Sequence, residues 1–132
     1  MGRKFLAVLA GVIVAGVVVF VGEAVGSRMF PSPPGMNALD PASLKAHAGE
    51  LPLGAFIAVL VSWALGSFAG GFTASGIARG ARGPAVVVGV ILMAMGDANF
   101  FAFPHPLWVI VLSPVCFVPF AWLGGALATR ER

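Results

Sequence analysis

Hydrophobic residues dominate four long runs of the chain, and short polar segments separate these runs. A helix that crosses a bilayer needs about 20 apolar residues, and each run reaches that length. The chain of 132 residues has room for four such helices and little else. Pro114 and Pro119 interrupt the last run and predict a kink there. The pattern predicts one all-α integral membrane domain over residues 1–132, with spans of about 4–24, 52–78, 84–103 and 107–128 and an external loop over 25–51.

The external loop is the one sizeable polar segment. Its prolines make regular helix impossible over residues 28–35, because proline fixes φ and removes a backbone donor. Asp40 is a good N-cap, Pro41 suits a first helical turn and Gly49 suits a helix end. We therefore expect a short helix over residues 40–49, lying on the membrane surface.

Basic residues are divided unequally between the two sides of this four-span layout. Arg28 and Lys45 fall on the side of the external loop. The positive-inside rule places the side richer in lysine and arginine in the cytoplasm. Both termini are therefore expected in the cytoplasm and the loop outside. The six basic residues on the expected cytoplasmic side are Arg3, Lys4, Arg79, Arg82, Arg130 and Arg132.

Composition supports the membrane interpretation and excludes several other functions. The chain is 59% hydrophobic and 10% charged, whereas a soluble domain carries about 25% charged residues. Its net charge of +3 does not indicate nucleic-acid binding, because the basic residues flank hydrophobic runs instead of forming a patch. Cys116 is the single cysteine, so no intrachain disulfide can form.

Catalytic signatures are missing from the sequence. It contains no nucleophile beside a base, no phosphate-binding loop and no cofactor motif. His47 and His105 have no partners at the spacing of metal ligands, and a metal site needs three or four groups. We therefore expect a protein that is not an enzyme and that uses neither a cofactor nor a metal.

Small residues mark one side of the second span, within Trp63–Arg79. Gly66 and Gly70 are four residues apart, and so are Gly71 and Ser75. Residues at this spacing share a helical face, and small side chains allow another backbone to approach closely in lipid. We expect the second span to be the helix against which the others pack. The predicted helix-packing residues are Gly66, Gly70, Gly71, Ser75, Gly124 and Gly125.

The two halves of the chain resemble each other. The first span ends in Val21-Gly-Glu-Ala24, and the third contains Met95-Gly-Asp-Ala98. The second span contains Gly70-Gly71, and the fourth contains Gly124-Gly125. Two tandem hairpins related by an axis along the membrane normal would give this pattern. Chance is the alternative, because glycine and alanine are common in spans.

Acidic residues within or near the spans are the candidates for chemistry. Asp97 lies about 13 residues into the third span, where an ionisable residue is costly and usually faces the bundle interior or water. Glu23, Asn99 and His105 are expected on the same side of the membrane. These four residues could form an outward-facing polar site for a cation or a proton. The alternative is that Asp97 and Glu23 are paired, with Arg28 for example, and only fix the helix register.

Several motifs resemble those of a group of small bacterial four-span membrane proteins. They are Met29-Phe-Pro-Ser-Pro-Pro-Gly35 after Glu23, then Gly66-Ser-Phe-Ala-Gly-Gly-Phe-Thr-Ala74, and later Pro106-Leu-Trp108. The resemblance covers nearly the whole chain. It implies a bacterial source and an inner-membrane location, and it carries over no catalytic residue.

Two functions follow as expectations. The first is a small non-enzymatic membrane protein that acts through helix packing, as an accessory subunit of a membrane complex or as a homo-oligomer. Its partners would be the lipid bilayer and other membrane subunits or itself. The alternative is a small oligomeric transporter or channel whose outward-facing acidic site uses Glu23 and Asp97.

Overall fold

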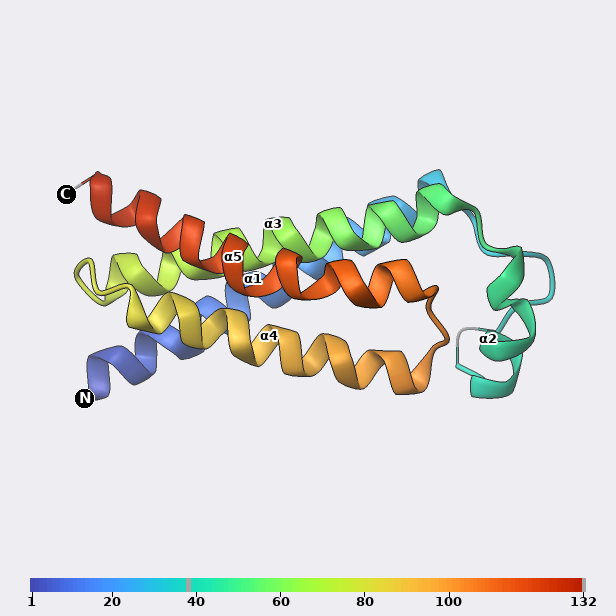
Figure 1. Ribbon diagram of the computed structural model, residues 1–132, viewed down its shortest axis with the longest axis horizontal. Helices are drawn as coiled ribbons and strands as arrows, with labels where there is room; N and C mark the ends of the chain where they lie inside the picture. Colours follow the sequence, from blue (N-terminus) through green and yellow to red (C-terminus); the bar gives the residue numbers. More distant parts are fainter. Residues whose placement is uncertain (38, 132) are drawn as a thin grey trace.

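The described part of the chain, residues 1–37 and 39–131 of a computed structural model, is helical and contains no β-strand. Figure 1 shows four long helices running alongside one another, with both termini at one end and a short helix, α2, at the other. We call these the terminal end and the α2 end. The helices in chain order are α1 (Gly2–Met29), α2 (Pro41–His47), the single turn η1 (Ala48–Glu50), α3 (Leu53–Ile77), α4 (Gly83–Ala102) and α5 (Leu107–Arg130).

The four long helices, α1, α3, α4 and α5, are each long and apolar enough to cross a membrane by length and composition. The bounds of α3, α4 and α5 lie within two residues of the expected spans. Helix α1 continues to Met29, five residues past the expected end of the first span. The expectation that Arg28 and Met29 lie outside regular helix is therefore wrong. The helix stops at Phe30 because the proline at position 31 disfavours helical backbone in the residue before it.

Two connections set the directions of the helices. At the α2 end, Asp40 Oδ1 accepts a hydrogen bond from the Ala42 backbone N–H at 3.1 Å and caps α2. At the terminal end, Arg79 and Gly80 have φ values of 55° and 86°. This left-handed backbone ends α3, and the Gly80 N–H donates to the Ser75 carbonyl at 2.9 Å. The chain then reverses directly into α4.

Helix α3 packs against α1, α4 and α5, and its interfaces with α1 and α5 are the most extensive in the bundle. On the α1 side, a Cβ atom built on Gly70 would lie 2.6 Å from the Gly11 carbonyl oxygen. A Cβ built on Gly66 would lie 2.9 Å from the Ala15 carbonyl oxygen. The two backbones are therefore too close for any larger side chain at Gly66 or Gly70.

The α3–α5 interface is closer still. A Cβ on Gly71 would collide with the Ala121 carbonyl oxygen, and one on Gly124 would collide with the Phe68 carbonyl oxygen. Ser75 is fully buried, and its Oγ lies 2.7 Å from the position of a Cβ on Gly125. These glycines place small residues from both helices in direct backbone contact toward the terminal end.

Large aromatic side chains fill the bundle toward the α2 end instead. Trp63 of α3 stacks on Phe117 of α5 with ring centroids 5.1 Å apart, and both residues are buried. Helices α1 and α4 approach each other near Gly11 and Val88 and diverge toward the α2 end (Figure 1). Tight packing at the terminal end and divergence at the α2 end leave space between these helices.

Helix α5 continues through Pro114 and Pro119 as one α-helix. Figure 1 shows its path bending near its middle, where both prolines lie. Each proline removes one backbone donor and displaces the preceding turn, which is the usual cause of such a bend.

Candidate functional site

Two adjoining cavities occupy the space between α1, α3 and α4 toward the α2 end. The outer cavity has a volume of about 410 Å³, and its walls include Glu23, Asn99 and His105. The inner cavity has a volume of about 300 Å³ and extends to Gly16, at the middle of α1. Glu23 and Asn99 line both cavities. We call the two together the acidic pocket.

Glu23 projects from the last third of α1 and is half-buried. Its Oε1 accepts a hydrogen bond of 3.1 Å from the indole N–H of Trp63, which is only 4% exposed. Within the described residues, the carboxylate has no other hydrogen bond and no ion pair. A carboxylate has about four acceptor sites, so a single neutral donor leaves both its charge and most of its lone pairs available.

His105 lies in the turn between α4 and α5, within the short sequence Phe103-Pro-His-Pro106. Its Nδ1 is 2.8 Å from the Phe103 carbonyl oxygen. A carbonyl oxygen can only accept, so Nδ1 carries the proton and Nε2 is the acceptor in the neutral ring. The backbone of the turn thereby fixes which nitrogen can bind a donor.

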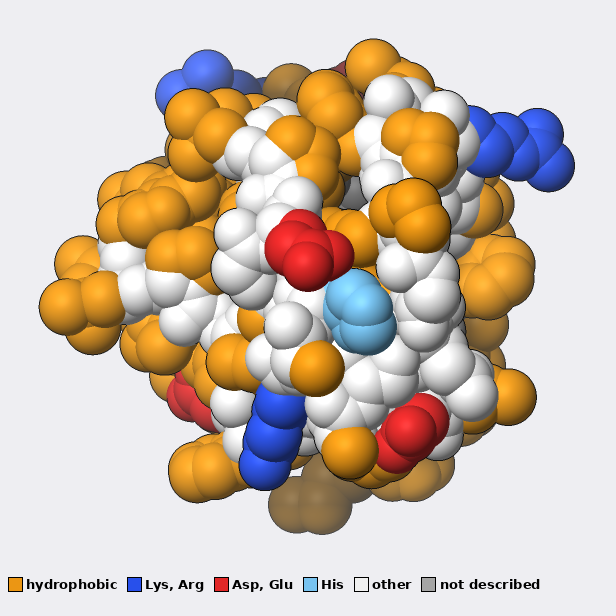
Figure 2. Space-filling model, turned by 90° about the vertical axis from the view of Figure 1, so that its right-hand side faces the viewer, with side chains coloured by type: hydrophobic (Ala, Val, Ile, Leu, Met, Phe, Trp, Pro, Cys, Tyr) orange, Lys and Arg blue, Asp and Glu red, His pale blue; other side chains and the backbone are white. Residues whose placement is uncertain are grey.

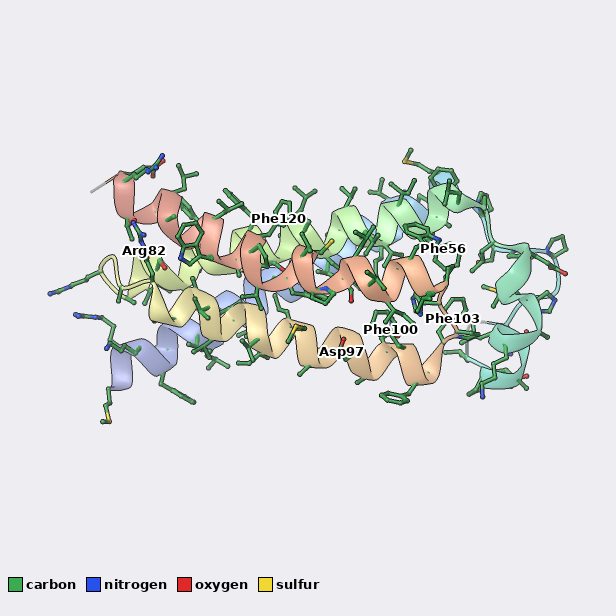
Figure 3. All side chains as sticks on the ribbon, in the orientation of Figure 1. Phe56, Arg82, Asp97, Phe100, Phe103 and Phe120 are labelled. Carbon is green, nitrogen blue, oxygen red and sulfur yellow. The ribbon has the colours of Figure 1, made fainter. Side chains whose placement is uncertain are left out.

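Four aromatic rings surround the imidazole of His105. Their centroids lie 5.0 to 6.3 Å from it. Figure 3 shows Phe56, Phe100 and Phe103 gathered toward the α2 end. The imidazole therefore packs among hydrocarbon edges and is half-buried. The four rings belong to Phe56 and Trp63 of α3, Phe100 of α4 and Phe103 of the following turn.

Burial lowers the pKa of His105 below its ordinary value of 6.5. The Phe103 carbonyl and the negative charge of Glu23 raise this pKa and offset part of the effect. The burial effect is the larger one, so the ring is neutral at pH 7 and Nε2 carries a free lone pair.

Stability should depend on pH through this residue. Because the pKa of His105 is lower in the folded protein than in the unfolded chain, the unfolded chain binds the proton more readily below pH 6.5. The free energy of unfolding should therefore decrease as the pH falls through 6.5. Unfolding in sodium dodecyl sulfate between about pH 8 and about pH 5 measures this. His105→Gln should remove this part of the pH dependence, with His47→Gln as the matched control. If the free energy of unfolding depends on pH equally in His105→Gln and in the wild type, His105 is not the source of this dependence.

The structure brings together three of the four residues predicted for the polar site. Glu23, Asn99 and His105 line the acidic pocket. Asp97 is exposed and lines neither cavity, and Figure 3 shows it nearer the terminal end than Phe100 and Phe103. Asn99 shares its helical face with Gly96, whereas Asp97, two residues from Asn99, points to a different side of α4.

Sequence reasoning missed two residues of the site. Trp63 is the one described hydrogen-bond partner of the Glu23 carboxylate, and Phe56 contacts His105. They lie seven residues apart, so about two helical turns place them on the same side of α3. This spacing of two aromatic residues is the sequence signal that could have placed both of them at the site.

Other candidate groups lie outside the acidic pocket. His47 has its Nδ1 2.8 Å from the Ser43 carbonyl oxygen, near the end of α2. Cys116 is a free, half-buried cysteine in α5. Among the residues that the structure describes, no group of three or more His, Cys, Asp and Glu side chains could hold a metal ion.

Comparison of the chain with known protein families, with curated proteins and with solved structures finds no match. The resemblance drawn from the sequence motifs therefore has no counterpart in these comparisons. Functional inference rests on the geometry of the acidic pocket.

Proposed function

We propose that this chain is a multi-pass protein of a bacterial inner membrane, with both termini in the cytoplasm and the α2 end outside. The four long apolar helices support a membrane location. Viewed from the α2 end, charged side chains of both signs and a histidine lie on the end surface, and hydrophobic side chains project from the sides (Figure 2). The excess of lysine and arginine at the terminal end supports the orientation.

In this orientation the acidic pocket opens toward the outside and binds a small cation. The observation that carries the proposal is the Glu23 carboxylate, which lines both cavities and has one neutral hydrogen-bond donor among the described residues. A carboxylate charge within a membrane-spanning helix is costly unless an opposite charge or hydrogen-bond donors accompany it. A bound cation would supply that opposite charge from solution.

The shape of the bundle supports the idea that the bound cation is transported. The inner cavity reaches Gly16 and Leu92, near the middle of α1 and α4. Beyond it, toward the terminal end, glycine contacts bring α3 against α1 and α5. An outer half that is hollow and an inner half that is tightly packed correspond to the outward-facing state of a transporter.

A second candidate is an accessory subunit or a homo-oligomer, and the position of Asp97 favours it. Asp97 is exposed on α4, and Phe101, one turn further along the same side of the helix, is 89% exposed. A lipid-facing carboxylate is unfavourable, and a neighbouring subunit could cover it. The two candidates are compatible, because small transporters can act as oligomers.

Thiol labelling tests whether the acidic pocket opens outside. In a Cys116→Ala background, Asn99→Cys places a thiol in the pocket, and Ala98→Cys places one beside it that lines neither cavity. A charged, membrane-impermeant methanethiosulfonate added outside right-side-out vesicles should modify Asn99→Cys much faster than Ala98→Cys. Equal rates, or modification only from the cytoplasmic side, would refute an outward-facing pocket.

A further inference from the structure

The polar lining of the acidic pocket carries the negative charge of Glu23, and its neutral side chains Asn99 and Ser32 can both accept and donate hydrogen bonds. The Glu23 carboxylate and the Nε2 atom of His105 both accept hydrogen bonds. Ser27 donates its hydroxyl proton to the Glu23 backbone carbonyl at 2.7 Å, so its oxygen is left to accept. No lysine or arginine is among the described residues that line either cavity. A matching ligand therefore brings positive charge and its own donors.

The remaining walls of the outer cavity are mostly apolar. They include the rings of Phe30, Phe56 and Phe103 and the side chains of Leu51 and Val59. Divalent ions such as Ca²⁺ need about six to eight oxygen ligands, whereas Glu23 is the one carboxylate lining this cavity among the described residues. A volume of about 410 Å³ is within the range of pockets for small organic molecules. The walls fit a hydrocarbon body better than a hydrated inorganic ion.

The aromatic rings distinguish between classes of organic cation. Quaternary ammonium groups are usually held in a cage of open ring faces. Here the four rings pack against the His105 imidazole, at 5.0 to 6.3 Å, so this residue fills the space within them. A quaternary ammonium has no N–H and would leave the Nε2 acceptor unmatched. A primary or secondary ammonium can donate to both acceptors.

We propose that the acidic pocket binds a primary or secondary organic ammonium ion, with N–H groups donating to the Glu23 carboxylate and to His105 Nε2 and an apolar body against Phe56 and Phe103. This inference rests on the cation-binding function proposed above. Such amines are protonated at neutral pH, because their pKa is near that of lysine, about 10.4.

The ammonium group could belong to a free amine or to a lipid headgroup. An apolar groove of about 590 Å³ between α1 and α3 shares Gly26, Phe30 and Ala58 with the outer cavity. An acyl chain in this groove would bring an aminophospholipid headgroup to the acidic pocket. Both sources present the same N–H chemistry, and the test separates them.

Fluorescence of Trp63 provides the test. Replacing Trp108 and Trp122 with Phe leaves Trp63, which donates to Glu23, as the single tryptophan. In lipid-free maltoside micelles, phenethylammonium should change the fluorescence emission of Trp63 in a saturable way. Its N,N,N-trimethyl analogue should bind at least about tenfold more weakly, because it loses the charge-assisted hydrogen bonds. Sodium and potassium chloride at equal ionic strength should give no saturable change.

The His105→Phe variant tests the second acceptor. Phenylalanine keeps an aromatic ring among the four neighbours but lacks Nε2, so the preference for phenethylammonium over its trimethyl analogue should fall by about tenfold. Size-exclusion chromatography verifies that the variant is folded. If it is not folded, the His105→Gln variant, which keeps a side-chain acceptor, should retain the preference. Loss of the preference in folded His105→Gln would overturn the role of Nε2.

The outcomes separate the ligand class from the general function. Equal binding of the two analogues, or binding of inorganic cations alone, would overturn the ammonium proposal and leave cation binding intact. Binding of no cation would overturn both. In nanodiscs, competition by phosphatidylethanolamine but not phosphatidylcholine supports the lipid source, and absence of competition supports a free amine.

Discussion

Replacing Gly124 with leucine is expected to lower the free energy of unfolding by about 3 kcal/mol or more. Overpacking a well-packed interior typically costs about 1–3 kcal/mol, and here the obstructing atom is the carbonyl oxygen of Phe68. A backbone atom cannot rotate away as a side chain can, so α5 must separate from α3. Unfolding in mixed micelles of maltoside and sodium dodecyl sulfate measures the loss.

Gly16 provides the control for this prediction. It is exposed on α1, and no heavy atom lies within 4 Å of the position of its Cβ. Gly16→Ala should therefore leave stability unchanged or slightly increased, because alanine favours helix, whereas Gly124→Ala should already be destabilising. If both alanine variants unfold like the wild type, the α3–α5 contact is not as close as described.

Replacing Glu23 with glutamine is expected to weaken cation binding by about 10- to 100-fold. A hydrogen bond to a charged group contributes about 1.5–3 kcal/mol, and each 1.4 kcal/mol is about a factor of ten in affinity. Glutamine keeps the size of the side chain and can still accept from the Trp63 indole. Its effect therefore reports the charge of Glu23, and isothermal titration calorimetry in detergent measures it.

Much of the helical architecture could be predicted from the sequence, because hydrophobic run length and proline positions act locally. The four long helices were found, and three have bounds close to those expected. The first span was expected to end at residue 24, where the polar external loop begins. The helix that contains this span continues to Met29, since the first proline comes only at position 31.

The candidate site was predicted only in part, for a reason of helical geometry. The matching segments Gly22-Glu-Ala24 and Gly96-Asp-Ala98 suggested that Glu23 and Asp97 are equivalent. Yet Asp97 and Asn99 are two residues apart, about 200° around a helix, and cannot both face one pocket. Asn99 lines the acidic pocket, and Asp97 does not.

The aromatic partners depend on contacts that run between helices. Nothing local in the sequence joins Trp63 to Glu23, which is 40 residues away, or Phe56 to His105. Each contact joins α3 to a part of the chain that only the folded bundle brings beside it. The tandem duplication stays a prediction.

The role of Glu23 in cation binding is tested most directly by calorimetric titration of wild type, Glu23→Gln and Asp97→Asn with phenethylammonium, sodium chloride and potassium chloride. Asp97→Asn should bind phenethylammonium like the wild type, whereas Glu23→Gln should lose about 10- to 100-fold in affinity. Each substitution removes one carboxylate, and the two carboxylates lie in neighbouring parts of the bundle. A general effect of negative charge would therefore weaken cation binding equally in the two variants. Unchanged binding by Glu23→Gln, or a larger loss in Asp97→Asn, would show that Glu23 is not the cation-binding carboxylate.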